Sequence, residues 1–124
     1  KIMKKIVLIY ALLAFSISES KAQSFNNEGQ VVSFMEGKEF KNSGNGLVIE
    51  YGYISSVNTY GIKVKNKRGD KFHFINVKID CYGSFADLYG MSTKNGSNFG
   101  FRLYRNKLIV GKGEPGESTY YLSR

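Results

Sequence analysis

Short runs in which apolar and polar residues alternate are the feature that most limits the fold of this chain. After residue 22 such runs recur about every ten residues, and clusters rich in Gly, Asn, Ser and Asp separate them. Alternation with a period of two is typical of β-strands that bury one face. We find no segment after residue 22 with the apolar period of a helix. The sequence therefore predicts an all-β domain.

We expect about eight short strands, at 31–35, 47–54, 60–65, 71–79, 85–91, 99–104, 108–111 and 119–122. Short connections favour an antiparallel meander, because parallel neighbours need long crossovers. The meander can close into a small barrel or fold over as a sandwich, and we favour the barrel because closure removes edge strands. Its outline is similar to lipocalin-like barrels, although the chain has no Trp and lacks their Gly-x-Trp signature.

Two of these strands predict a specific hairpin. Tyr60–Val64 and Phe72–Phe74 each alternate, and Lys67-Arg68-Gly69 lies between them as a turn. This register places Lys63 and Lys65 outward. In the second strand the apolar phase then changes from even to odd positions, which predicts a β-bulge near Ile75-Asn76.

The first 22 residues have the organisation of a secretory signal peptide. Lys4 and Lys5 precede an apolar run over 6–17, and small residues stand at Ser20 and Ala22. The run is shorter than the roughly 20 residues that span a bilayer, so we expect no membrane span in the mature chain. We predict a signal peptide at 1–22, a flexible arm at 23–29, a single all-β domain at 30–124, and a periplasmic or extracellular location.

The chain is basic, with 18 Lys and Arg against 10 Asp and Glu. Four of the cations belong to the predicted signal peptide and say nothing about a binding face. The others gather mainly near two turns: Lys63, Lys65, Lys67, Arg68 and Lys71 near the first, and Arg102, Arg105 and Lys107 near the second. Of these, Arg102 and Arg105 would form a basic rim that favours an acidic partner.

Residues 97–104 resemble the ribonucleoprotein octapeptide of RNA-recognition domains at four positions. Arg102 stands where that family has a buried apolar residue. The aromatic residues that would stack on bases, Phe99 and Phe101, share a face with Leu103. We therefore interpret the segment as a core strand and expect no nucleic-acid partner.

The residues that could carry catalysis are few. His73 is the only histidine and Cys81 the only cysteine, and eight residues of extended strand separate them by about 26 Å. The single cysteine excludes an intramolecular disulfide, and one His with one Cys cannot form a structural zinc site. No carboxylates have the spacing of a catalytic pair. We expect no catalytic residues, no metal and no cofactor.

Tyrosine is the feature with most functional content, since it combines a large apolar body with a polar tip. We expect a small exported, non-catalytic binding or inhibitory module that acts through a Tyr-rich, mildly basic surface or through the barrel mouth. The candidate binding residues are Tyr51, Tyr53, Tyr104, Arg102 and Arg105, and the partner would be a protein, a glycan or a small apolar ligand. The alternatives are a cell-surface assembly component that pairs through an edge strand and, last, an enzyme.

The signal peptide can be tested directly. We predict cleavage between Ala22 and Gln23, because small residues at Ser20 and Ala22 follow the apolar run. Intact-mass measurement of protein from the producing cell should give a chain that begins at Gln23. A full-length chain in the cytosol would contradict both the cleavage and the export.

Overall fold

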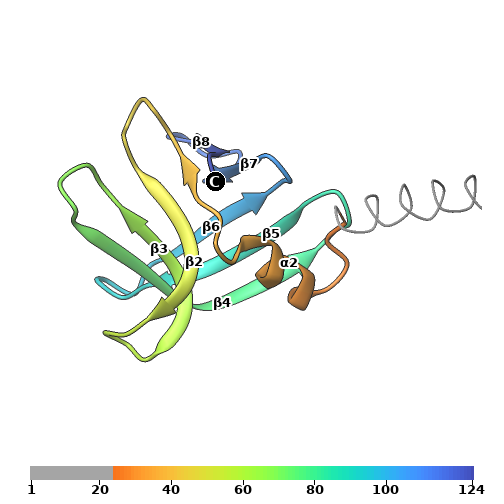
Figure 1. The fold of residues 1–124 in the computed structure, drawn as a ribbon, viewed down its shortest axis with the longest axis horizontal. Helices are drawn as coiled ribbons and strands as arrows, with labels where there is room; N and C mark the ends of the chain where they lie inside the picture. The colour runs from red at the N-terminus through yellow and green to blue at the C-terminus, as the bar shows by residue number, and fades with distance from the viewer. Residues whose placement is uncertain (1–23) are drawn as a thin grey trace, which may run out of the picture.

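The chain folds into a closed antiparallel β-barrel in the computed structural model, which describes residues 24–124 (Figure 1). The predicted signal peptide lies outside the described residues. The eight strands follow one another around the barrel as β1 (Phe40–Lys41), β2 (Val48–Ile54), β3 (Thr59–Lys65), β4 (Lys71–Cys81), β5 (Ala86–Ser92), β6 (Asn98–Leu103), β7 (Lys107–Val110) and β8 (Ser118–Leu122). The all-β prediction and the preference for a barrel over a sandwich are confirmed.

Closure depends on the shortest strand. In β1, Phe40 lies opposite Ile49 of β2 and also opposite Leu122 of β8. Alternation does not predict this strand, because two residues are too few to show it. Strands β2 to β8 correspond to the seven later strands that we predicted.

The prediction of a strand over 31–35 is wrong, because these residues belong to a helix, α2 (Glu28–Met35). Asn27 caps it: its side chain accepts a hydrogen bond from the Gln30 N–H at 2.9 Å. The Gln30 side chain in turn accepts from the Asn26 N–H at 2.8 Å. Val31 and Met35, one helical turn apart, are both buried in the barrel core. The helix lies across β2 and β4 in Figure 1.

The segment before the helix is also packed. Phe25 is 1% exposed and belongs to the core, where its ring meets Phe34 edge-on at 5.3 Å. Its backbone exchanges two hydrogen bonds with Gly83, in the turn after β4. The prediction of a flexible arm is therefore wrong at Phe25, because an aromatic side chain in an otherwise polar segment anchors it.

Inward-facing side chains fill the barrel. The fully buried ones include Phe40, Ile49, Ile62, Leu88, Leu103 and Leu108, which alternate with outward positions along their strands. Phe101 is buried as predicted, but Phe99 is 41% exposed, and its ring meets the Phe74 ring in a T-shaped contact at 5.1 Å. Its position at the start of β6 explains the difference, since the strand enters the core only after it. Among residues 24–124, the one helix is too short to cross a membrane.

The predicted hairpin is confirmed in its register. Val64 lies opposite Phe72 and Lys63 opposite His73, so that the lysines of β3 face outward. The predicted bulge is confirmed as well: the pairing of β4 with β5 shifts register between Ile75 and Lys78. Asn76 within it has a φ of 53°, a conformation that Asn adopts more readily than most residues.

The bulge lets β4 turn away from β3 and continue along β5, and two glycines accommodate the bend. A Cβ atom at Gly61 of β3 would overlap the carbonyl oxygen of Phe74. A Cβ atom at Gly90 of β5 would lie 2.8 Å from the Cβ of Phe74. Phe74 thus packs between two neighbouring strands that carry no side chain where it approaches them.

Substitution of Gly61 tests this arrangement. We expect Gly61→Ala to lower the free energy of unfolding by about 1–3 kcal/mol, because the added methyl group must displace the β4 backbone. Gly100→Ala is the matched control, since a Cβ there would meet only the Tyr89 ring at 3.7 Å, and it should change stability by less than about 0.5 kcal/mol. Urea denaturation measures both, and equal effects of the two substitutions would contradict the close approach.

Candidate functional site

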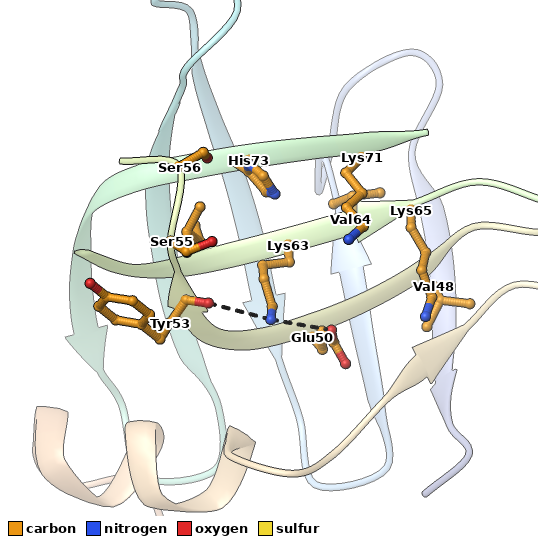
Figure 2. A pocket seen from close by; sticks show the side chains of 11 residues that line it. Val48, Glu50, Tyr53, Ser55, Ser56, Lys63, Val64, Lys65, Lys71 and His73 are labelled. Atoms are coloured by element: carbon orange, nitrogen blue, oxygen red, sulfur yellow. Dashed lines mark hydrogen bonds and ion pairs between the residues drawn. The ribbon is translucent and has the colours of Figure 1, made fainter. Parts of the chain in front are cut away.

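The outer face of β2, β3 and β4 carries a groove lined by polar and basic side chains (Figure 2). The strand pairing arranges them in two rows that run across the strands. Glu50, Lys63 and His73 lie opposite one another in the first row. Val48, Lys65 and Lys71 form the second. Both rows face outward because Ile49, Ile62 and Val64 occupy the buried positions between them.

The next row of the sheet carries two glycines. Gly52 of β2 lies opposite Gly61 of β3, and neither position is open, since Lys63 covers the first and the Phe74 carbonyl oxygen and Ile54 lie against the second. Ile54, 2% exposed, packs against the Gly61 position, and Ser55 and Ser56 of the following turn close that end. The hollow has a volume of about 340 Å³, which suits a small ligand or one part of a larger one.

Lys63 is held in place by neighbouring oxygens. Its Nζ lies 3.6 Å from the Glu50 carboxylate and donates to the Tyr53 carbonyl oxygen at 3.5 Å, as the dashed lines in Figure 2 show. The end of the side chain passes over the Gly52 position at 3.4 Å. Glu50 therefore neutralises Lys63, and the pair forms one wall of the groove.

Lys65 and Lys71 have a different environment. They lie directly opposite each other at the ends of β3 and β4, and both are exposed. Within the described part of the chain neither of them forms an ion pair. The nearby Asp70 carboxylate is engaged by the Asn66 amide at 3.1 Å. Like charges that face each other across two strands destabilise a sheet, so this pair has an unfavourable interaction that an anion would relieve.

The groove offers hydrogen-bond donors of several kinds. Three lysine ammonium groups, the His73 ring and the hydroxyl groups of Ser55 and Ser56 line it, and all of these can donate to oxygen atoms of an anion. Over residues 24–124, no three His, Cys, Asp or Glu side chains come close enough to hold a metal ion. The donors make the groove chemically suited to an anion.

The two predicted tyrosines of β2 have separate roles. Tyr51 packs against the barrel core, and its ring stacks on Tyr60 at 6.3 Å. Burial, with the negative charges of Glu28 and Glu36, raises the pKa of the Tyr51 phenol above its ordinary value. Tyr53 is 46% exposed and lines the groove at the end nearest Ser55. Of the predicted binding residues, only Tyr53 lines this groove.

The other three predicted residues lie along β6 and the turn after it. Arg102 forms a bidentate pair with Asp87, at 2.8 and 3.0 Å, and its guanidinium covers the Phe85 ring at 4.3 Å. These contacts with Asp87 raise the pKa of Arg102 further. Tyr104 is half-buried against Phe85, and Arg105 is exposed in the turn. The Arg102 guanidinium is thus engaged within the fold, and none of the three lines the groove.

The two reactive side chains are on different sides of the sheet. His73 lines the outer groove, whereas Cys81, at the far end of the same strand, packs against the core. Burial raises the pKa of the Cys81 thiol, with smaller contributions from Glu28 and Asp80. A raised pKa keeps the sulfur protonated and poorly nucleophilic.

The groove residues were only partly visible in the sequence. The cluster of lysines around the β3–β4 turn was recognised, but His73 was considered only as a catalytic residue. The pairing of Lys65 with Lys71 follows from the hairpin register, which the alternation did predict. The sequence did not predict that Gly52 lies opposite Gly61, although both glycines stand within alternating runs.

Comparisons with known proteins add no functional assignment. No family model matches the chain, and no curated protein or solved structure matches it either.

The repulsion between the two lysines makes a measurable prediction. We expect Lys65→Gln to raise the free energy of unfolding by about 0.2–1 kcal/mol at low ionic strength, because it removes a like-charged cross-strand pair. The gain should shrink in 1 M salt, where the screening length is about 3 Å. Lys63→Gln, on the same strand, is the control and should give no gain because it loses the Glu50 ion pair. A gain for Lys65→Gln that persists in high salt would contradict the electrostatic cause.

Proposed function

We propose that this chain is a non-catalytic binding module that takes an anionic group of its partner in the groove between β2, β3 and β4. The observation that carries the proposal is the Lys65–Lys71 pair, which lies face to face without a carboxylate of its own. A bound anion would turn an unfavourable pair into two charge-assisted contacts. The protein therefore gives up some stability for binding, as functional sites commonly do.

The architecture favours a surface site over the barrel mouth. The barrel interior is occupied by large apolar side chains, such as Phe40, Leu88 and Phe101. A small apolar ligand inside the barrel would have to displace them. The groove is formed instead on the outside, where the donors are solvent-accessible.

The two alternative functions receive less support. Each of the eight strands has a neighbour on both sides over at least part of its length, so no strand of the barrel is free along one whole edge. Catalysis would need a base, a nucleophile and an orienting group together, whereas His73 and Cys81 point to opposite faces. We also propose that the module acts outside the cytoplasm, on the strength of the signal-peptide pattern at residues 1–22.

Titration with a small polyvalent anion tests the proposal. Citrate added to ¹⁵N-labelled protein should shift the backbone amide signals of Lys65, Lys71 and His73 in a saturable way. The variant Lys65→Gln/Lys71→Gln should bind citrate at least about tenfold more weakly, because two hydrogen bonds to charged groups are lost.

A matched control separates the site from the overall charge. Lys78→Gln/Lys112→Gln also removes two positive charges, one from the other end of β4 and one from the loop after β7. This variant should bind citrate like the unmodified protein. Citrate affinity that falls equally in both variants, or survives in the first, would refute the groove as the site.

A further inference from the structure

A single row of outward side chains continues the groove around the barrel. Val48 lies opposite Lys65 on one side and opposite Lys41 of β1 on the other. Lys41 lies opposite Tyr121 of β8, which lies opposite Lys107 of β7. We call the six residues in register across β4, β3, β2, β1, β8 and β7 the lysine row: Lys71, Lys65, Val48, Lys41, Tyr121 and Lys107.

The members of the row share the outer surface because their chain neighbours occupy the core. Phe40, Leu108 and Tyr120 are buried beside Lys41, Lys107 and Tyr121, and successive residues of a strand face opposite sides. Tyr121 is 60% exposed. The row therefore presents four ammonium groups, one aromatic ring and one valine to solvent.

No carboxylate interrupts the row. Lys41 has only a long contact of 3.9 Å with Glu39, which also pairs with Arg124 at 3.3 Å. Lys107 lies 5.2 Å from the centre of the Tyr104 ring and, like Lys65 and Lys71, forms no ion pair within residues 24–124. Neighbouring strands are about 4.8 Å apart, so the six strands space the row over roughly 24 Å along the barrel surface.

A hollow beside the row extends the accessible surface past the groove. It is lined by Lys41, Leu47, Lys67 and Tyr121 and shares Val48 with the groove. The Lys67 side chain lies directly against Gly46 and adds a fifth cation at this edge. A ligand that occupies the groove can therefore continue into this hollow without leaving the basic surface.

We propose that the lysine row binds an acidic polysaccharide, whose repeated carboxylate or sulfate groups follow the row from the groove toward β7. The inference rests on the proposed function, because the groove is its first subsite. A single small anion would use only Lys65 and Lys71, whereas the continued row calls for a ligand with charges at intervals along a chain.

The composition of the row favours a polysaccharide over other polyanions. Lysine ammonium groups act as point charges. They bind sulfate or carboxylate groups in many orientations, without the bidentate geometry of arginine. Single-stranded nucleic acids are held by successive aromatic platforms, and this row has one. An acidic peptide that added a strand would need a free sheet edge, whereas the four inner members of the row have a strand partner on both sides.

Ligand length and salt dependence test the inference. Heparin oligosaccharides of four and ten sugar units serve as probes, and binding is measured by calorimetry over a range of salt concentrations. We expect the ten-unit chain to bind at least tenfold more tightly than the four-unit chain. A longer chain can also bind a short site in several positions, but that statistical effect increases the affinity only a few-fold.

Variants at the two parts of the row separate its contributions. Lys41→Gln/Lys107→Gln should weaken binding of the ten-unit chain about tenfold and make the slope of log affinity against log salt about two units shallower. It should change binding of the four-unit chain by less than twofold. Lys78→Gln/Lys112→Gln, with the same charge, should leave both unchanged.

The outcomes distinguish this inference from the proposed function. If both oligosaccharides bind equally well and only Lys65→Gln/Lys71→Gln weakens them, the groove stands and the row is refuted. If neither oligosaccharide binds while citrate still shifts the amide signals of Lys65, Lys71 and His73, the row is refuted and the proposed function stands. If citrate does not bind either, both proposals fail. Tighter binding of a single-stranded DNA or polyglutamate of equal charge would overturn the assignment to a polysaccharide.

Discussion

The bend of β4 at Phe74 is the constraint on which the rest of this barrel depends. Before the bend β4 pairs with β3, and from Phe74 onward it pairs with β5. The change of partner requires the register shift after Ile75 and the close approach of Phe74 to Gly61 and Gly90. Without it the first strands would continue as a flat sheet, since closure of a barrel needs strongly bent and twisted strands.

Closure in turn fixes which surface residues meet. Once β1 pairs with both β2 and β8, Lys41 is in register with Val48 on one side and Tyr121 on the other. The lysine row therefore results from the same pairings that bury Phe40, Ile49 and Tyr120. A one-residue slip in any strand would turn its member of the row into the core, so the apolar core holds the charged surface in register.

Local sequence patterns predicted the features that depend on residues close in the sequence, and they missed the features that depend on closure of the barrel. The β3–β4 register and the bulge followed from alternation and its change of phase. Helix α2 was missed because its one apolar turn also reads as a short strand, although Asn27 and Gln30 have the spacing of a helix N-cap. Strand β1 and its lysine depend on contacts between distant parts of the chain, which alternation does not report.

The same limit applies to the candidate site, because the sequence shows residue types but not the contacts that each side chain makes. Tyr104 was selected because tyrosine combines an apolar body with a polar tip, and Arg102 because a basic rim favours an acidic partner. The fold instead pairs Arg102 with Asp87 and packs Tyr104 on Phe85. Residue type alone does not show whether a side chain is engaged by other side chains of the protein or is free to contact a ligand. What distinguishes the two kinds of group is whether an opposite charge lies beside them. Lys63 and Arg102 each pair with a carboxylate, whereas Lys65 and Lys71 face each other. A like-charged pair in a fixed register is the observation that favours an anion site here, because an anion would relieve the repulsion between its two members.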